Sequence, residues 1–396
     1  MPMDIAFFGS SLVSAYWNGA ATYYRGIIRA LAARGHQITF YEPDAYQRQE
    51  HRDIPDPPWC RVVVYPNSRD HALHCIEQAR TADLVVKASG VGVFDELLET
   101  AVLSLKRHNN LVCFWDVDAP ATLDRASHDG DYFRPLIPQY DLVLTYGGGP
   151  PVQQKYQSMG ARQCVPIYNA LDPQTHHPVA PDPRFQADLA LCANRLPDRE
   201  ARVEEFFLRP AAEARELRFL LGGSGWGDRP MSPNVTYAGH VYTADHNAFN
   251  CTPRAVLNVN RDSMASYGYS PPTRVFEAAG AGACLITDRW VGLDLFLDED
   301  SEVLVAADSD QVVEHLRRLS DKRARRIGDT ARRRILAQHT YDHRARLFAD
   351  VISGRYNQRR QRAITGSHPG DTAPPDKPHR REQPRHEPAE QSRYAS

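Results

Sequence analysis

The sequence predicts an α/β protein made of two similar halves, each with an open, doubly wound parallel sheet. Short apolar runs alternate with amphipathic helical stretches, beginning with a β-loop-α-β unit over residues 4–43. The alternation starts again near residue 188. The 396-residue length is too great for one ordinary domain and suits two domains with a terminal segment.

The first half contains six apolar runs that predict strands, at residues 4–8, 37–43, 61–66, 82–89, 110–116 and 140–147. Helical stretches lie between them, and in the first of these Gly35 suits a helix end. We expect an N-terminal Rossmann-like domain over residues 1–170.

The second half repeats this pattern, with strand candidates at residues 188–193, 217–223, 235–241, 255–261 and 283–288. A helix is expected within residues 197–213, with Pro197 near its start. We expect a second Rossmann-like domain over residues 171–354. Residues 355–396 are rich in Pro, Arg and His and poor in aliphatic residues, so we expect a disordered tail.

Composition and charge exclude several classes of protein. The formal net charge of −2 gives no general attraction to nucleic acid or to an anionic membrane. No apolar run approaches the roughly 18 residues of a membrane span, and the N-terminus lacks the pattern of a signal peptide. The seven cysteines include no CxxC pair, which indicates reduced thiols. We therefore expect a cytoplasmic protein with no transmembrane segment and no nucleic-acid partner.

Ligands of doubly wound sheets bind in the loops at the carboxyl ends of the strands. The first such loop, "GSSLVSAYWNGAATYY", lacks the GxGxxG fingerprint of an NAD enzyme. Asn18 and Gly19, which precede the next helix, could bring backbone N–H groups near an anion or a sugar. A plain tight loop is the alternative.

Two carboxylates, Asp116 and Asp118, follow the strand that ends in "VCFWD". One of them could accept the proton of a hydroxyl nucleophile as a general base. Alternatively, both are loop aspartates that bind their own backbone.

The stretch "YGYSPPTRVFEAAGAGACLITD" predicts a helix whose start could bind phosphate. Ser270 can cap this helix, and the first free N–H groups belong to Thr273 and Arg274 because the two residues before them are prolines. Glu277 shares a face with Arg274 and can accept hydrogen bonds from a ribose diol. The alternative is an Arg–Glu pair above a close-packed core contact.

Other segments carry weaker signals. Arg199 stands where a second helix begins and also suits phosphate. His339 and His343 are four residues apart, but no third ligand is evident, so we expect no metal.

The block from Tyr267 to Leu297, "YGYSPPTRVFEAAGAGACLITDRWVGLDLFL", resembles CgeB-like (spore-maturation-type) glycosyltransferases, together with "AQHTYDHRARL", "WDVDAPATLDR", "NVNRDSM" and "ANRLPDRE". The resemblance implies the GT-B fold of two Rossmann-like domains facing a cleft. It also implies a nucleotide-sugar donor on the C-terminal domain, an unidentified acceptor on the N-terminal domain, and no metal or other cofactor. Glu277 would contact the ribose. The other donor-binding residues implied are Arg274, Thr273, Ser270, Arg261, Arg199 and Gly282.

The sequence departs from this family pattern in ways that affect the mechanism. Many retaining members have a second Glu eight residues before the one that corresponds to Glu277, and this position is Tyr269. The stereochemical outcome therefore stays open.

Two alternative functions remain. One is a GT-B-fold epimerase acting on the nucleotide sugar, and the other is a non-catalytic nucleotide-sugar-binding protein.

Overall fold

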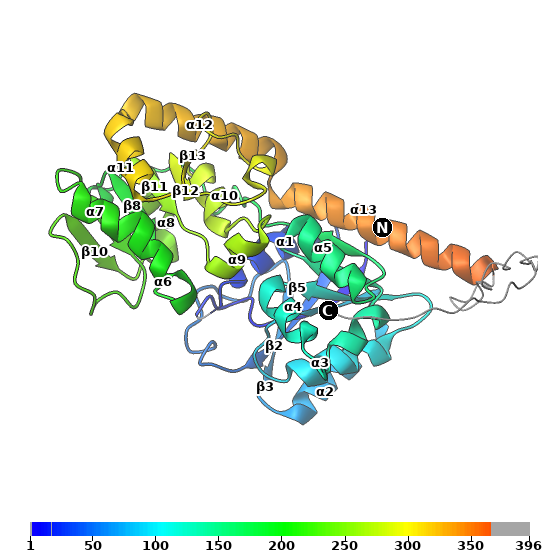
Figure 1. The fold of residues 1–396 in the computed structure, drawn as a ribbon. Coiled ribbons are helices and arrows are strands. Elements are labelled where there is room, and N and C mark those ends of the chain that lie inside the picture. The colour runs from blue at the N-terminus through cyan, green and yellow to red at the C-terminus, as the bar shows by residue number, and fades with distance from the viewer. Residues whose placement is uncertain (1, 17, 366–396) are drawn as a thin grey trace, which may run out of the picture. The chain divides into compact units, whose positions relative to one another are not determined.

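The computed structural model describes residues 2–16 and 18–365, and these residues form two parallel β-sheets covered by helices (Figure 1). The predicted α/β class with two Rossmann-like sheets is confirmed. Residues up to Tyr356 form one compact unit.

The first sheet has seven strands in the order β3-β2-β1-β4-β5-β6-β7. Its strands are β1 (Asp4–Phe8), β2 (Gln37–Asp44), β3 (Arg61–Pro66), β4 (Leu84–Ala88), β5 (Leu111–Asp116), β6 (Leu142–Thr145) and β7 (Cys164–Pro166). Its helices are α1 (Ala21–Ala33), α2 (Arg69–Gln78), η1 (Ala79–Thr81), α3 (Asp95–Ala101), η2 (Val102–Leu105), α4 (Ala119–Ser127), η3 (Arg134–Gln139) and α5 (Gly149–Ser158). The strand order reverses between β1 and β4, where a doubly wound sheet opens a crevice for ligands.

Both faces of the first sheet are buried, which explains the uninterrupted apolar runs in its strands. Alternate residues of one strand point to opposite faces. Phe114 of β5 therefore lies in one core, whereas Cys113 and Trp115 lie in the other.

The second sheet has six strands in the order β10-β9-β8-β11-β12-β13. Its strands are β8 (Leu189–Cys192), β9 (Phe219–Gly222), β10 (Val235–Gly239), β11 (Ala255–Asn258), β12 (Leu285–Asp288) and β13 (Leu304–Ala306). Its helices are η4 (Pro183–Phe185), α6 (Pro197–Val203), η5 (Glu204–Leu208), α7 (Arg209–Glu213), η6 (Thr243–Asp245), α8 (His246–Cys251), α9 (Asp262–Tyr267), α10 (Thr273–Gly280), η7 (Leu293–Leu295), α11 (Ser309–Arg318) and α12 (Asp321–Gln338). The strand order reverses between β8 and β11. The edge strands β7 and β13, which have three residues each, are not among the predicted strands.

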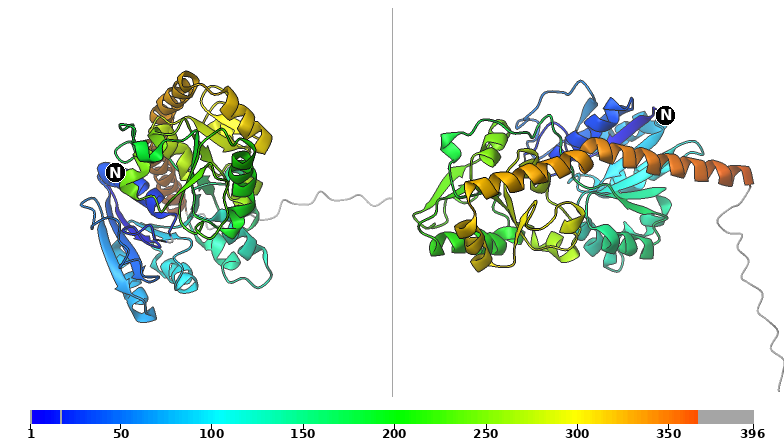
Figure 2. Two further views of the ribbon diagram at one scale, coloured as in Figure 1. Left: turned by 90° about the vertical axis from the view of Figure 1, so that its left-hand side faces the viewer. Right: turned by 90° about the horizontal axis from the view of Figure 1, so that it is seen from above.

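The last helix, α13 (Tyr341–Thr365), returns the chain to the first sheet (Figure 2). Its apolar side chains Tyr341, Ala345, Phe348 and Ile352 recur every three to four residues and lie in the core on one face of that sheet. Part of the segment that we assigned to the C-terminal domain thus completes the first core. The domain limits themselves stay a prediction.

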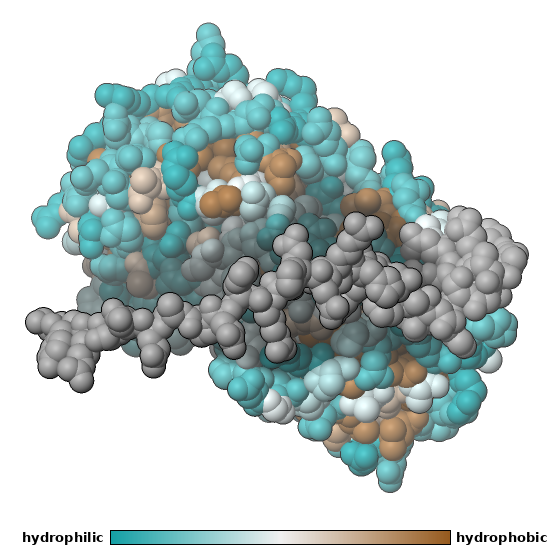
Figure 3. Space-filling model, turned by 45° about the vertical axis from the view of Figure 1, so that its right-hand side comes forward, coloured by the Kyte–Doolittle hydropathy of each residue, from teal (hydrophilic) through white to brown (hydrophobic). Residues whose placement is uncertain are grey.

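Helix α13 also changes the description of the C-terminal segment. Residues 355–365, which we expected to be disordered, continue this helix. The rest of the expected tail, residues 366–396, lies outside the described residues. No helix in the described ranges is long and apolar enough to cross a membrane. The face drawn in Figure 3 is mainly hydrophilic, with scattered groups of apolar side chains.

Candidate functional site

A cavity of about 520 Å³ lies at the carboxyl ends of strands from both sheets. Its walls include the loop after β1, the loop after β5, the start of α6, the segment after β11 and the segment before α10. The predicted site residues that line it are Asn18, Gly19, Asp118, Arg199, Arg261, Ser270 and Thr273. The cavity is therefore at the position where doubly wound sheets bind ligands.

Direct contacts join the first-sheet and second-sheet sides around this cavity. The Arg261 guanidinium lies 3.5 Å from the Asp118 carboxylate. The N–H of Gly148 donates to the Tyr269 carbonyl at 2.8 Å, and the Asn169 side chain donates to the Pro271 carbonyl at 3.1 Å. The loops of the two sheets thus meet at the site itself.

The two aspartates after β5 have different surroundings. Asp116 is fully buried and accepts hydrogen bonds from Ser89 Oγ at 2.7 Å, Thr122 Oγ1 at 3.0 Å, Tyr156 OH at 2.5 Å and the backbone N–H of Asp118 at 3.0 Å. Burial raises the pKa of the Asp116 carboxyl, although the hydrogen bonds from Tyr156 and Ser89 oppose this shift. Asp116 therefore stabilises the loop after β5 through these hydrogen bonds. It does not line the cavity.

Asp118, in contrast, lines the cavity and is about one-third exposed. Its Oδ2 faces Arg261, and its Oδ1 is buried without a hydrogen-bond partner among the described residues. Of the two carboxylates that we considered as a general base, Asp118 is the one that a bound hydroxyl group can reach.

Arg261 is held between two carboxylates. Its Nε donates to Asp198 Oδ2 at 2.6 Å, and Ser263 Oγ donates to the same oxygen at 3.0 Å. Burial lowers the pKa of Arg261, but Asp118 and Asp198 outweigh that effect and raise it overall. The Arg261 guanidinium is consequently fixed in place at the cavity wall.

Arg199, in the first turn of α6, carries a positive charge without a paired carboxylate. It forms no hydrogen bond or ion pair through its side chain in the described part of the chain, and its Nε is buried without a partner. Burial, followed by the like charges of Arg274 and Arg261, lowers the pKa of Arg199 to about 10. Three guanidinium groups thus gather where an anion would relieve their repulsion.

The start of α10 forms the part of the cavity wall next to Arg199. The N-terminal cap of this helix differs from the predicted one. The helix begins at Thr273 with Pro272 in the capping position, and no side chain caps it. Ser270 is buried and donates to the Gly268 carbonyl at 3.0 Å instead of capping the helix. The N–H groups of Thr273 and Arg274 therefore have no partner within the helix, whereas that of Val275 donates to the Pro272 carbonyl at 3.1 Å. The two free groups add to the positive potential beside Arg199.

Glu277 lies one turn further along α10, outside the residues that line the cavity. Its carboxylate is 4.0 Å from the ring of His176. Burial raises the pKa of Glu277, but the nearby His176, Arg274 and His246 outweigh burial and lower it overall. Glu277 is therefore ionised at neutral pH and can accept hydrogen bonds from a diol.

The remaining predicted residues have mainly structural contacts. Gly282 is not at the phosphate-binding end: it has a φ of +79° after the last turn of α10, and its carbonyl packs against Gly328 of α12. Gly282 is not among the residues that line the cavity, and its assignment to the donor site stays a prediction. Asn18 lines the cavity, but its amide group is occupied by Ser10, Ser11 and Ser14. Gly19 has open space where a Cβ would be.

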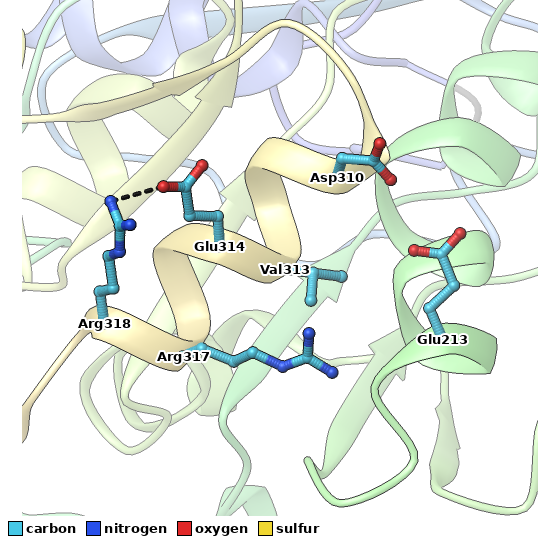
Figure 4. A pocket seen from close by; sticks show the side chains of 6 residues that line it. All are labelled: Glu213, Asp310, Val313, Glu314, Arg317 and Arg318. Atoms are coloured by element: carbon cyan, nitrogen blue, oxygen red, sulfur yellow. Dashed lines mark ion pairs between the residues drawn. The ribbon is translucent and has the colours of Figure 1, made fainter.

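A second hollow, of about 360 Å³, lies between α7 and α11 (Figure 4). Both of its arginines form surface ion pairs, Arg318 with Glu314 at 2.5 Å and Arg317 with Glu216 at 3.1 Å. It lacks the buried unpaired charge that distinguishes the cavity between the sheets.

Comparison with known proteins supports a sugar-transferase fold. Residues 199–350, which include Arg199, Arg261 and all of α10, match the sequence model of a family described as "Glycosyl transferase-like". No curated protein matches the chain.

Several solved structures have the same fold. HepE from Anabaena, in complex with UDP and glucose, has 12% identity and a TM-score of 0.63, covering 89% of this chain and 100% of that one. Sucrose-phosphate synthase from Thermosynechococcus elongatus has 13% identity and a TM-score of 0.62, covering 92% and 100%. An α-glucosyltransferase in complex with UDP-glucose and DNA containing an abasic site has 9% identity and a TM-score of 0.65, covering 89% and 100%. The chain therefore has the GT-B fold of nucleotide-sugar glycosyltransferases.

Proposed function

We propose that this protein is a glycosyltransferase that moves a sugar, a hexose or a related residue, from a nucleotide-diphosphate donor to an acceptor hydroxyl. The observation that carries this proposal is that Arg199, Arg261 and Arg274 gather beside the start of α10, with Asp118 on the first-sheet side of the same cavity. The family match over residues 199–350 and the UDP complexes of proteins with this fold support it.

The donor lies along the second sheet in this proposal. Arg199, Arg261 and the N–H groups of Thr273 and Arg274 bind the diphosphate, and Glu277 binds the ribose hydroxyls. The diphosphate gains negative charge as it leaves, so fixed positive groups stabilise the transition state more than the bound donor. We propose that these groups take the place of a metal and that no other cofactor is needed.

The acceptor lies on the side of the first sheet. The bond from the sugar anomeric carbon to the phosphate oxygen breaks, and a bond from that carbon to the acceptor oxygen forms. Asp118 takes the acceptor proton in an inverting transfer, and Asp116 positions Asp118 through its bond to the Asp118 N–H. We propose a CgeB-like (spore-maturation-type) enzyme that acts in the cytoplasm.

The test separates donor binding from turnover. Calorimetry with UDP-glucose is expected to show at least tenfold weaker binding for Glu277→Ala than for the parent. Asp118→Asn should bind the donor within twofold of the parent but release UDP about 10²- to 10⁴-fold more slowly with a pool of sugar acceptors. Parent-like donor affinity in Glu277→Ala contradicts the ribose assignment.

The same assay distinguishes the alternative functions. NMR of UDP-glucose incubated without an acceptor would reveal a nucleotide-sugar epimerase by conversion of the donor sugar. Donor binding without turnover against every acceptor would indicate a binding protein. Either result would contradict the transferase.

A further inference from the structure

The cavity contains a fourth arginine, Arg48, which the proposed donor site does not use. Arg48 follows β2 and lines the cavity on the side of the first sheet. It is only 6% exposed. Its Nη1 donates to the carbonyls of Ser10 at 3.2 Å and Val91 at 3.3 Å, which fixes the direction of the guanidinium.

Arg48 forms no ion pair in the part of the chain that the structure describes, although the charge of Glu42 acts on it from a distance. The acid in its vicinity, Glu42, accepts hydrogen bonds from Ser11 Oγ at 2.8 Å, the Leu12 N–H at 2.6 Å and Gln49 Nε2 at 2.7 Å. The Nε of Arg48 is buried without a partner, and Nη2 donates no hydrogen bond to a described residue. A buried, unpaired cation is unfavourable unless a ligand supplies the opposite charge.

The backbone before Arg48 is held in an unfavourable conformation. Tyr46 and Gln47 have φ angles of 57° and 58°, in the left-handed region that such residues rarely adopt. Tyr46 OH donates to the Gly92 carbonyl at 2.7 Å, and the Tyr46 ring packs under the Arg48 guanidinium at 5.0 Å. Specific contacts thus keep the positive group at the cavity wall.

We propose that Arg48 binds a phosphate or carboxylate group on a small acceptor. The inference rests on the proposed function, which assigns the arginines of the second sheet to the donor diphosphate. Arg48 lies on the opposite, acceptor side, and its planar guanidinium matches an oxyanion through two N–H donors. The acceptor is small because its anionic group must enter a cavity of about 520 Å³ to reach this buried side chain.

The experiment uses protein saturated with UDP, so that the donor arginines are occupied. Inorganic phosphate and acetate are then titrated separately by calorimetry at constant ionic strength. The parent is expected to bind one of these anions, and Arg48→Gln is expected to bind it at least tenfold more weakly. Glutamine keeps an N–H donor for the two carbonyls. The control is Arg69→Gln, which removes an exposed arginine at the start of α2.

UDP affinity is the second measurement. It is expected to stay within twofold of the parent in Arg48→Gln, which also shows that the variant is folded. A tenfold loss of UDP affinity would overturn the proposal by placing Arg48 in the donor site. Anion affinity equal to the parent's, or no anion binding by the UDP-saturated parent, would also overturn it.

Arg48→Lys provides a second variant in case the glutamine variant does not fold. Lysine keeps the charge without the planar fork, so an at least threefold loss of anion affinity is expected, and unchanged affinity contradicts the proposal. Failure of the parent to bind UDP would contradict the proposed function instead. Anion binding that depends on Arg48 would then still identify an anion site, separately from transferase activity.

Discussion

Arg199 is the residue in which the demands of folding and of ligand binding conflict most clearly. Burial and the charges of Arg274 and Arg261 lower its pKa to about 10, yet it is still protonated at neutral pH. A basic group whose pKa is lower in the folded state than in the unfolded state destabilises the fold while it is charged. A diphosphate in the cavity would reverse this effect by supplying opposite charge.

Arg199→Met is therefore expected to raise the melting temperature of the protein without ligand by about 2–4 °C for each kcal/mol of repulsion removed. The same change is expected to weaken UDP binding about 10- to 100-fold, since it removes charge-assisted hydrogen bonds. Thermal unfolding and calorimetry measure the two effects. Arg325→Met, which removes an exposed arginine on α12, serves as the control. A lower melting temperature with unchanged UDP affinity would contradict both statements.

At the scale of elements, a buried histidine lies at the break between α12 and α13. His339 is 8% exposed, and its Nδ1 accepts a hydrogen bond from Arg344 Nη2 at 3.1 Å, so the neutral ring carries its proton on Nε2. Burial, helped by Arg344 and Arg334, lowers the pKa of His339 to about 3. Arg344 also donates to the carbonyls of Tyr168 and Asn169, beside the cavity wall.

This histidine should make stability depend on pH in a definite direction. The unfolded chain binds a proton at His339 below its ordinary pKa of about 6.5, whereas the folded chain does not until about pH 3. The free energy of unfolding is therefore highest above pH 6.5. It should fall by up to about 1.4 kcal/mol for each pH unit below that value.

His339→Gln removes this proton uptake, so the decline in stability between pH 6.5 and pH 4 is expected to become shallower. Urea unfolding at a series of pH values measures the slope. His74→Gln, at an exposed position on α2, is the matched control. Equal slopes in the parent and in His339→Gln would show that His339 does not titrate as its burial predicts.

At the scale of the whole molecule, α13 makes the first sheet depend on residues more than 300 positions away from β1. Phe348 is fully buried, and its ring stacks on Trp115 of β5 with centroids 5.5 Å apart. The core on this face of the first sheet is therefore completed only after the second sheet has been traversed.

Phe348→Ala should thus lower the free energy of unfolding by about 3–5 kcal/mol, the usual cost of deleting a buried aromatic ring. Leu347→Ala, the neighbouring position, which is 40% exposed, should cost less than about 1 kcal/mol. Denaturant unfolding followed by tryptophan fluorescence compares them. A similar small loss in both variants would mean that α13 contributes little to the first core.

Most of the fold is predictable from the sequence because the patterns that indicate strands and helices are local. The buried strands were visible as short apolar runs, and the helices as periodic ones, since each pattern depends on neighbouring residues. The edge strands β7 and β13 were missed because three residues carry too little pattern. The helical continuation through residues 355–365 was missed because polar composition suggested disorder there.

The candidate site was predictable in part for the same reason. Arg199 and Arg261 follow strands β8 and β11, and loops at strand ends meet in a doubly wound sheet. Gly282 follows the carboxyl end of α10, away from Arg274, so its assignment to the donor site stays a prediction. No local signal indicated Arg48, because its place at the cavity depends on contacts with Ser10 and Val91.

The sequence by itself determined the class of fold and the chemistry available at the strand ends: arginines, a helix start and two aspartates. Only the tertiary structure decided that Asp118 lines the cavity while Asp116 is buried beneath it. It also decided that α13 completes the first core and that Arg48 lines the cavity. The physical reason is that burial and charge pairing depend on residues distant in the chain. Such contacts leave no periodic pattern in the segments that form them.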